Sequence, residues 1–355
     1  FDTSSGLQDD CVNHVFQDNQ GNVWLPLNNG ISKIEYVSPF TLFNEQYGLK
    51  GPALSVAKHK NLLNVGTTFG LFYQTPTGTF RPVPGVSTIC RHLLLVNDSL
   101  MVAADSGIFQ VKGSDKSRRN NLEQISTLPS SFLLRSKRDK NRTWVGTQKG
   151  LISLYFDNTN DQWKQDLKFE NIAQEITSIV ETENGSLWLS TSNEGVIKVD
   201  FPTDLHNPIV NRYGESQGLP PKQIYITKAA GRAIFATEKG LYRFDEAEKI
   251  FVPDKIFADE FSRGVFRLVE DKYKHIWIHS RSRNIQAIFQ PDGSYMLNRK
   301  PFLRLPNAQV NTIYPDPGGE SIWFASNKGL FCYDTTFEKN YNQTFKTFLR
   351  KVNLI

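Results

Sequence analysis

The sequence repeats a pattern of three short strands, and this repetition is the feature that most restricts the possible folds. The clearest copy is residues 176–201 (ITSIVETENGSLWLSTSNEGVIKVDF), in which three apolar runs are separated by turn-forming segments at 183–185 and 192–195. β-branched and aromatic residues favour strands, and Asn-Gly is a strong hairpin signal. Three strands alone cannot bury their apolar faces, so we expect each copy to pack against further copies.

Eight copies follow one another at a nearly constant spacing. Each has a glycine, or in one case an asparagine, between its second and third strands: Gly30, Gly70, Gly107, Gly150, Gly195, Gly240, Asn284 and Gly329. The steps between these positions are 40, 37, 43, 45, 45, 44 and 45 residues. A tight turn at this point favours positive φ, which Gly accepts freely and Asn tolerates best among the other residues. Steps of this size are typical of four-stranded propeller blades.

The spacing therefore predicts an all-β fold, a β-propeller of four-stranded blades. Eight repeats are counted, and the ring is seven- or eight-bladed, with eight the simpler prediction. We expect the propeller to span residues 1–334, with the Trp of each complete repeat packed between neighbouring blades. Fourth strands are expected at 40–43, 80–83, 162–169, 208–213 and 251–257.

Composition excludes several classes of protein. The formal net charge of +5 is mild, and the basic clusters 116–119 and 135–142 are typical of solvated loops, so we expect no nucleic-acid binding. No run of about 18 apolar residues is present, so this stretch of chain is not expected to span a membrane. Cys11, Cys90 and Cys332 lack the spacing of a zinc or redox motif and are expected to be buried or free thiols.

The repeats resemble a known family, the two-component regulator propeller repeats of periplasmic sensor regions in Bacteroidetes regulators. The shared pattern is I-x-S-I-x-E-[DT]-x-x-G-x-[LV]-W-[IL]-x-T-x-x-G-[LV]-x-[KR]-[FVY]-D, with Y-x-x-x-x-G-L between copies. Residues 15–36 and 176–201 carry it best, residues 313–334 carry it fairly well, and the copies beginning at 53, 88 and 223 lack the Trp. Members of this family often have two seven-bladed propellers in tandem, which implies that one terminal repeat here belongs to a neighbouring propeller.

The resemblance also implies a role. Residues 335–355 (TTFEKNYNQTFKTFLRKVNLI) look like a segment leading into the immunoglobulin-like domain with three tyrosines that follows such propellers. The chain would then be the soluble, periplasmic sensor portion of an inner-membrane regulator of transcription. It would bind a small molecule or oligosaccharide, with no cofactor and no turnover, and the full-length regulator would form a homodimer.

Two other functions remain open at this point: a protein-interaction or dimerisation scaffold, and a polysaccharide-active hydrolase or lyase. No G-x-S-x-G, H-E-x-x-H or P-loop motif is present, so no catalytic residue is predicted. His275 and His279 are four residues apart, which on a strand spans about 13 Å, too far for one metal ion. We therefore predict no metal site and expect both histidines to have local hydrogen-bond partners.

The candidate ligand site lies in the turns between second and third strands, where the repeats differ. Arg281 and Arg283 place two guanidinium groups in one turn, suited to an anion, and Phe69 offers an apolar or stacking surface. In an eight-membered ring the first and eighth blades would separate these two turns. Those blades would contribute further hydrogen-bonding side chains, namely Asn28, Asn29, Asn327 and Lys328.

Overall fold

The computed structural model describes residues 2–3, 7–18, 21–34, 38–112, 122–257, 261, 264–281, 283–305 and 308–337. The chain divides into two units, Phe1–Thr41 and Leu42–Ile355. Helical structure in these residues is confined to short 3-10 segments, including η2 (Glu45–Tyr47), η4 (Glu215–Gln217) and η6 (Lys300–Arg304). None of the described helices has the length and apolar character needed to cross a membrane.

Seven four-stranded antiparallel sheets form the blades of unit 2, whose boundary at Leu42 falls within the strand β4. From the innermost strand outward they are β5 (Ala53–His59), β6 (Leu62–Thr67), β7 (Gly70–Gln74), β8 (Phe80–Pro82); β9 (Cys90–Val96), β10 (Ser99–Ala104), β11 (Gly107–Val111), β12 (Leu122–Ser126); β13 (Ser130–Arg135), β14 (Arg142–Thr147), β15 (Gly150–Asp157), β16 (Gln162–Lys168); β17 (Ile176–Glu181), β18 (Leu187–Thr191), β19 (Val196–Asp200), β20 (Ile209–Tyr213); β21 (Tyr225–Ala229), β22 (Arg232–Thr237), β23 (Gly240–Asp245), β24 (Ile250–Pro253); β25 (Val265–Glu270), β26 (Ile276–Ser280), β27 (Arg283–Phe289), β28 (Tyr295–Asn298); and β29 (Val310–Pro315), β30 (Ser321–Ser326), β31 (Gly329–Asp334), β4 (Phe40–Phe43).

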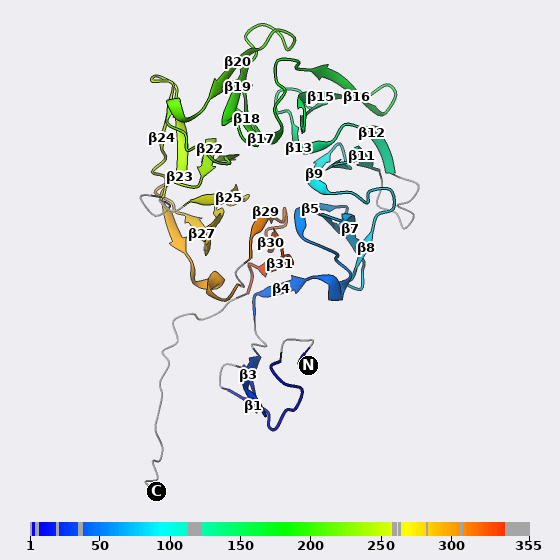
Figure 1. Ribbon diagram of the computed structural model, residues 1–355, viewed down its shortest axis with the longest axis vertical. Helices are drawn as coiled ribbons and strands as arrows, with labels where there is room; N and C mark the ends of the chain where they lie inside the picture. Colours follow the sequence, from blue (N-terminus) through cyan, green and yellow to red (C-terminus); the bar gives the residue numbers. More distant parts are fainter. Residues whose placement is uncertain are drawn as a thin grey trace. The chain divides into compact units, whose positions relative to one another are not determined.

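The seven innermost strands close a circle. β5 contacts β9, and the contacts continue through β13, β17, β21, β25 and β29 back to β5. Figure 1 shows the sheets radiating from this circle, with strands such as β8, β16 and β24 at the outside. The propeller fold is therefore confirmed, and the ring of unit 2 is seven-bladed.

The last blade joins the two ends of unit 2. β29, β30 and β31 come from the end of the described chain, and their fourth strand is β4 from its beginning. The segment 40–43 is thus a fourth strand, as expected, but it completes the last repeat and not the first. Phe43 packs against Trp323 with ring centroids 6.0 Å apart, so aromatic burial helps to hold this joint.

The first repeat lies in unit 1. It forms the three-stranded sheet β1 (Phe16–Gln17), β2 (Val23–Leu27) and β3 (Gly30–Ile34). The eight repeats counted in the sequence are therefore confirmed as eight sheets, of which seven form the ring. Of the segment 335–355, which was expected to lead into an immunoglobulin-like domain, residues 338–355 lie outside the described residues.

The hydrophobic core lies between neighbouring blades. Trp144 of β14 is 2% exposed and packs against residues of the next sheet, including Ile179 and Leu189. Trp188 of β18 does the same one blade further on, against Ile226 and Phe235. The prediction that these tryptophans fill the space between blades is confirmed, and it explains why one repeat alone would not fold.

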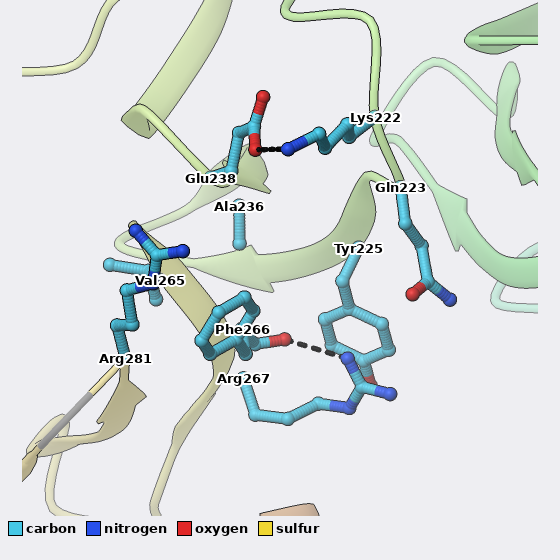
Figure 2. Close-up of a pocket in the computed structure, with 9 residues that line it drawn as sticks. All are labelled: Lys222, Gln223, Tyr225, Ala236, Glu238, Val265, Phe266, Arg267 and Arg281. Atoms are coloured by element: carbon cyan, nitrogen blue, oxygen red, sulfur yellow. Dashed lines mark hydrogen bonds and ion pairs between the residues drawn. The ribbon is translucent and has the colours of Figure 1, made fainter. Parts of the chain in front are cut away.

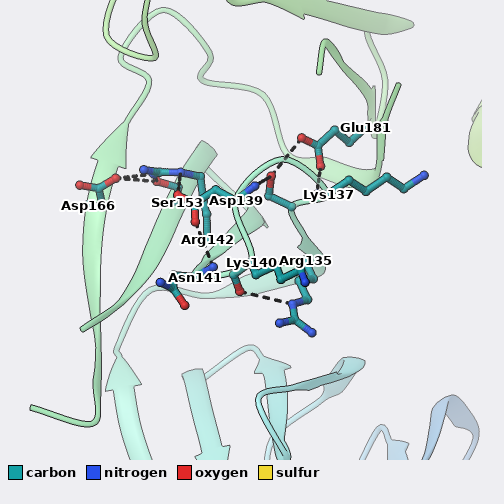
Figure 3. A network of polar contacts seen from close by, with 10 residues as sticks. Arg135, Lys137, Asp139, Lys140, Asn141, Arg142, Ser153, Asp166 and Glu181 are labelled. Carbon is teal, nitrogen blue, oxygen red and sulfur yellow. Dashed lines mark hydrogen bonds and ion pairs between the residues drawn. The ribbon is translucent and has the colours of Figure 1, made fainter. Parts of the chain in front are cut away.

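One edge of the ring also carries a closed belt of polar contacts. We call this edge rim 1; it consists of the hairpins between the first and second strands of each sheet. At all seven interfaces a side chain on or next to such a hairpin bonds to the neighbouring blade: Lys58 to Asp316, Lys60 to Asp98, Arg135 to Asn97, Glu181 to Ser136 and Lys137, Lys228 to Glu183, Glu270 to the Ala230 amide, and Lys272 to the Pro317 and Gly318 carbonyls. Figure 3 shows the Glu181 carboxylate directed at Lys137.

Candidate functional site

The opposite edge of the ring, rim 2, consists of the turns between the second and third strands of each sheet. Most of these turns share one construction, in which a Ser or Thr hydroxyl donates to the carbonyl three residues later, as Thr67 does to Gly70 and Ser280 to Arg283. The amide of the first turn residue donates to a carbonyl just before the innermost strand: Thr68 to Pro52, Gln148 to Pro129, Arg281 to Gly264 and Asn327 to Gln309. The first turn residue is therefore held close to the mouth of the ring.

A recurring bulge redirects side chains at the same mouth. The pairing of β25 with β26 shifts between Val265 and Arg267, so Phe266 is an extra residue on the innermost strand. β5, β9, β13, β17 and β29 shift at the equivalent place. Bulges bend a strand and re-aim its side chains, and here the bulge turns the Phe266 ring outward, leaving it 40% exposed.

A pocket opens on rim 2 between the blades that begin with β21, β25 and β29. It has two adjoining parts of about 290 and 230 Å³, both lined by Gln223, Phe266, Arg267 and Arg281. We call it the arginine pocket. The larger part is completed by Lys222, Tyr225, Ala236, Glu238 and Val265, and the smaller part by His279, Ala308, Gln309 and Val310. Figure 2 shows the larger part, with the Phe266 ring between the Arg281 side chain and the Arg267 guanidinium.

Arg267 is held rigidly at the centre of this pocket. Its Nε donates to the Asn311 carbonyl at 2.6 Å, and its Nη1 donates to the Phe266 carbonyl at 2.7 Å. Its guanidinium carbon lies 4.3 Å from the centre of the Tyr225 ring, a cation–π contact. Burial lowers the pKa of Arg267 and raises the pKa of Tyr225. The group nevertheless stays charged, because the ordinary pKa of arginine lies far above neutral pH.

The pocket carries more positive than negative charge. Among its described lining residues the one carboxylate is that of Glu238, which is bonded to Lys222 at 2.7 Å. Arg281 is exposed, and its side chain makes no hydrogen bond or ion pair with any described residue. Two guanidinium groups therefore face the pocket without a carboxylate partner in the described part of the chain.

His279 is a fixed, neutral member of the site. The Val310 amide donates to its Nε2 at 3.3 Å, so the ring proton is on Nδ1, which donates to Asn284 Oδ1 at 2.9 Å. Burial lowers the pKa of His279; the Asn284 bond opposes this effect, and the nearby positive charge of Arg267 adds to it. His275 accepts from the Phe289 amide at 3.1 Å. Both histidines have the local partners that the sequence predicted.

The structure separates the two arginines of the predicted site. Arg281 is the first turn residue and lines the pocket, whereas Arg283 begins β27, pairs with Ser280 and does not line it. Arg283 also occupies the position that glycine has in the other turns, where Thr67 pairs with Gly70. The assignment of Asn284 to that position was therefore wrong by one residue: Asn284 has no positive φ and serves as the partner of His279.

The other predicted site residues lie elsewhere. Phe69 is the second residue of its turn; its side chain is 62% exposed and lies against Gly51. Two blades were expected between the blade of Phe69 and that of Arg281, but the structure has one. Asn327 Oδ1 accepts from the Gln309 amide at 3.0 Å and so positions a residue of the pocket, while Lys328 beside it is exposed. Asn28 and Asn29 form the turn between β2 and β3 of unit 1.

Four residues of the pocket were not predicted, because they lie outside the turns between second and third strands where a ligand site was expected: Arg267, Gln223, Tyr225 and Gln309. One signal was available for Arg267. The equivalent residue after the bulge is Ser55, His92, Phe132, Ser178 or Thr312 in other innermost strands, so an arginine there stands out. No cluster of three or more metal-ligating side chains occurs among the residues that the structure describes.

Comparison with known proteins supports the assignment of the repeats. The family model of the two component regulator propeller matches residues 172–193, which include β17 and β18. The resemblance seen in the sequence is therefore confirmed at this repeat. Among curated proteins no sequence matches significantly.

Solved structures of several propellers are similar in fold. Two structures of the extracellular domain of a B. thetaiotaomicron signalling protein, described as a one component system and as a hybrid two component system, have TM-scores of 0.65 at 15% identity. The match covers 94% of this chain and 46% or 47% of theirs, so the chain spans about half their length. Virginiamycin B lyase from Staphylococcus aureus has a TM-score of 0.59 at 11% identity, over 82% of this chain and 97% of the lyase. At these identities the likeness concerns the fold.

Proposed function

We propose that this chain, one of whose repeats matches the two component regulator propeller, is a non-catalytic sensor in signal transduction. A small molecule or oligosaccharide binds in the arginine pocket on rim 2. The observation that carries this proposal is the pair of guanidinium groups at the mouth of a closed propeller, with no carboxylate partner among the described residues. The repeat match and the signalling proteins of similar fold support the sensory role.

In this proposal the chain works in the periplasm, as the soluble sensor portion of an inner-membrane regulator of transcription. Residues 1–334 supply propeller repeats and residues 335–355 lead into an immunoglobulin-like relay domain. The full-length regulator acts as a homodimer, so that ligand binding in two propellers is passed to one output.

The state of His279 supports binding without turnover. A histidine that acts as general base must have a free nitrogen near its substrate. In the arginine pocket both nitrogens of His279 already have partners within the chain, and burial disfavours its protonated form. Virginiamycin B lyase, which has a similar fold, represents the enzymatic alternative.

The proposal is tested by separating binding from turnover. The purified chain is titrated with a panel of neutral and acidic mono- and oligosaccharides by calorimetry, and each mixture is then analysed by mass spectrometry. We expect binding of at least one member without any product. Product formation that a single substitution abolishes would establish an enzyme instead. In cells, Arg281→Ala in the full-length regulator is expected to remove the transcriptional response to the bound compound, while Arg283→Ala retains it.

A further inference from the structure

The charges of the arginine pocket indicate the chemical class of its ligand. Its described lining has three cationic side chains, Lys222, Arg267 and Arg281, and one anionic side chain, Glu238. Because Lys222 and Glu238 are bonded to each other, the two arginines account for the excess. A desolvated cation without a counter-charge is costly, and a bound anion removes that cost.

The bonds of Arg267 leave one edge of its guanidinium for a ligand. Nε and Nη1 are occupied by the carbonyls of Asn311 and Phe266. Nη2 has no partner among the described residues, and it is not one of the buried atoms that lack a hydrogen bond, so it retains some solvent-accessible surface. Its position is fixed by the two carbonyls and by the Tyr225 ring, so an anion bound there does not have to order this side chain.

Arg281 complements this fixed donor. It extends from a turn into the same pocket, with Phe266 between the two guanidinium groups (Figure 2). An anion bound beside Phe266 would lie between the positive charges of Arg267 and Arg281. Gln223 and Gln309 are exposed at the margin and make no side-chain hydrogen bond within the described residues, so their amides are available to polar groups on the rest of the ligand.

The apolar part of the lining points to an organic anion. Phe266 is an exposed aromatic surface, and Val265, Ala236, Ala308 and Val310 add apolar contacts. Inorganic phosphate or sulfate would leave this surface unused, whereas a carboxylate attached to a ring or short chain would cover it. A carboxylate also suits a guanidinium group, since its two acceptor oxygens can take charge-assisted hydrogen bonds from the N–H donors.

We infer that the arginine pocket binds a small organic carboxylate, whose charged group is bound at Arg267 and attracted by Arg281 across Phe266, and whose body covers Phe266. This inference rests on the proposed function and specifies its ligand. A sugar acid and the carboxyl terminus of a short peptide share this chemistry.

The experiment compares carboxylates with neutral partners of the same shape. The probes for calorimetry are D-glucuronate against D-glucose, and N-acetylphenylalanine against N-acetylphenylalaninamide, with sodium sulfate as an inorganic anion. We expect the carboxylate of at least one pair to bind the wild type at least tenfold more tightly than its neutral partner. The pair that shows this preference identifies the source of the carboxylate.

Variants locate the binding. Arg281→Ala should remove most of the preference for the carboxylate, whereas Arg283→Ala, two residues away and outside the pocket, should keep it. Arg267→Gln should also remove it, and its unfolding curve shows whether the ring remains folded. Any of three results would overturn the inference. The two members of each pair could bind with equal affinity, the two turn variants could lose the same affinity, or sulfate could bind as tightly as the carboxylates. If neutral sugars still bind in those cases, the proposed function survives; if no probe or panel compound binds, both fail.

Discussion

The two rims of the ring use their polar side chains in opposite ways. On rim 1 each interface is crossed by a hydrogen bond or ion pair, from Lys58–Asp316 round to Lys272 and the Gly318 carbonyl. On rim 2 the turn residues bond within their own blade, as Lys222 does to Glu238 and Gln309 to Asn327. Bonds to the next blade come from the innermost strands behind the turns, as from Arg267 to Asn311 and from Asn311 to Ala53. The first pattern holds blades to one another, and the second leaves side chains at the mouth available to a ligand.

The difference between the rims indicates which residues of this fold contribute to stability and which contribute to ligand binding. Both rims are built from short hairpins of the same repeats. What differs is whether the charged side chains of the hairpins bond to the neighbouring blade. We therefore expect substitutions on rim 1 to change unfolding and those in the arginine pocket to change binding.

The largest effect should come from the backbone of a rim 2 turn. Gly150 has φ +116°, and a Cβ there would overlap the carbonyl oxygen of Ile172. Gly150→Ala should therefore lower the free energy of unfolding by at least about 3 kcal/mol, measured by urea denaturation. Gly231 on rim 1 is the matched control, with φ +77° and open space around it, and Gly231→Ala should cost about 1 kcal/mol. Similar losses at both sites would mean that neighbouring atoms do not constrain the rim 2 turn.

The second largest effect should come from acid. As the pH falls, the free energy of unfolding should decrease first through histidines of the inner strands and only at lower pH through the ion pairs of rim 1. Burial lowers the pKa of His92 to about 4 from an ordinary 6.5, and its ring stacks on Phe132 with centroids 4.2 Å apart. The unfolded chain then binds a proton that the folded chain rejects, so stability is full above pH 6.5 and falls as pH drops towards 4. The loss is about 3 kcal/mol. His279 contributes in the same direction, because burial lowers its pKa too.

Rim 1 should respond in a lower pH range. Hydrogen bonds from Lys60 and Lys228 lower the pKa values of Asp98 and Glu183, so the stability these pairs provide is lost only as the carboxylates protonate, below about pH 4. Urea unfolding between pH 7.5 and pH 4 should thus give a smaller loss in His92→Phe than in the wild type. The same pH slope in both proteins would exclude His92 as the cause.

Within rim 1, buried contacts should contribute more to the free energy of unfolding than exposed ones. Glu181 is 3% exposed and accepts from Ser136 Oγ at 3.0 Å and from the Lys137 amide at 2.6 Å. Glu181→Ala leaves these donors without a partner and should cost about 2 kcal/mol in thermal or urea unfolding. Glu183, whose side chain is 77% exposed, pairs with Lys228, and Glu183→Ala should change stability far less, with an effect that disappears at high salt. The reverse order would mean that the exposed pairs hold the ring.

The fold was largely predictable from the sequence, because its signals are local and repeated. Each blade can be identified from its own residues, by a turn glycine that recurs every 37–45 residues and by a core tryptophan such as Trp188. The pairing of β4 with β31 was not predictable in this way. Strand 40–43 follows the first repeat in the sequence, and its residues do not indicate which strand it pairs with. β12 and β28 were also missed, because short outer strands bury too few residues to show a pattern.

The candidate site was only partly predictable. The turn residue Arg281 was found from its type, but Arg283 has the same type and differs only in its place within the turn. Arg267 comes from the interior of a strand and reaches the pocket through the bulge at Phe266, which depends on pairing with β26. Sites assembled from three blades depend on such geometry, and residue type alone does not supply it.

The smallest effect on the free energy of unfolding should come from substitution of Arg281. This substitution therefore tests most directly whether rim 2 side chains serve binding and not stability. Lys58 of rim 1 pairs at 2.9 Å with Asp316, whose side chain is 9% exposed, so Lys58→Met should lower stability by about 0.5 to 1 kcal/mol and leave ligand binding unchanged. Arg281→Ala removes an exposed side chain with no partner in the described residues and should change the free energy of unfolding by less than about 0.5 kcal/mol. Measured together by urea denaturation and calorimetry, the two variants should show opposite patterns. If Arg281→Ala instead lowered stability by more than Lys58→Met, Arg281 would be joining blades as the rim 1 residues do, and the distinction between the rims would not hold.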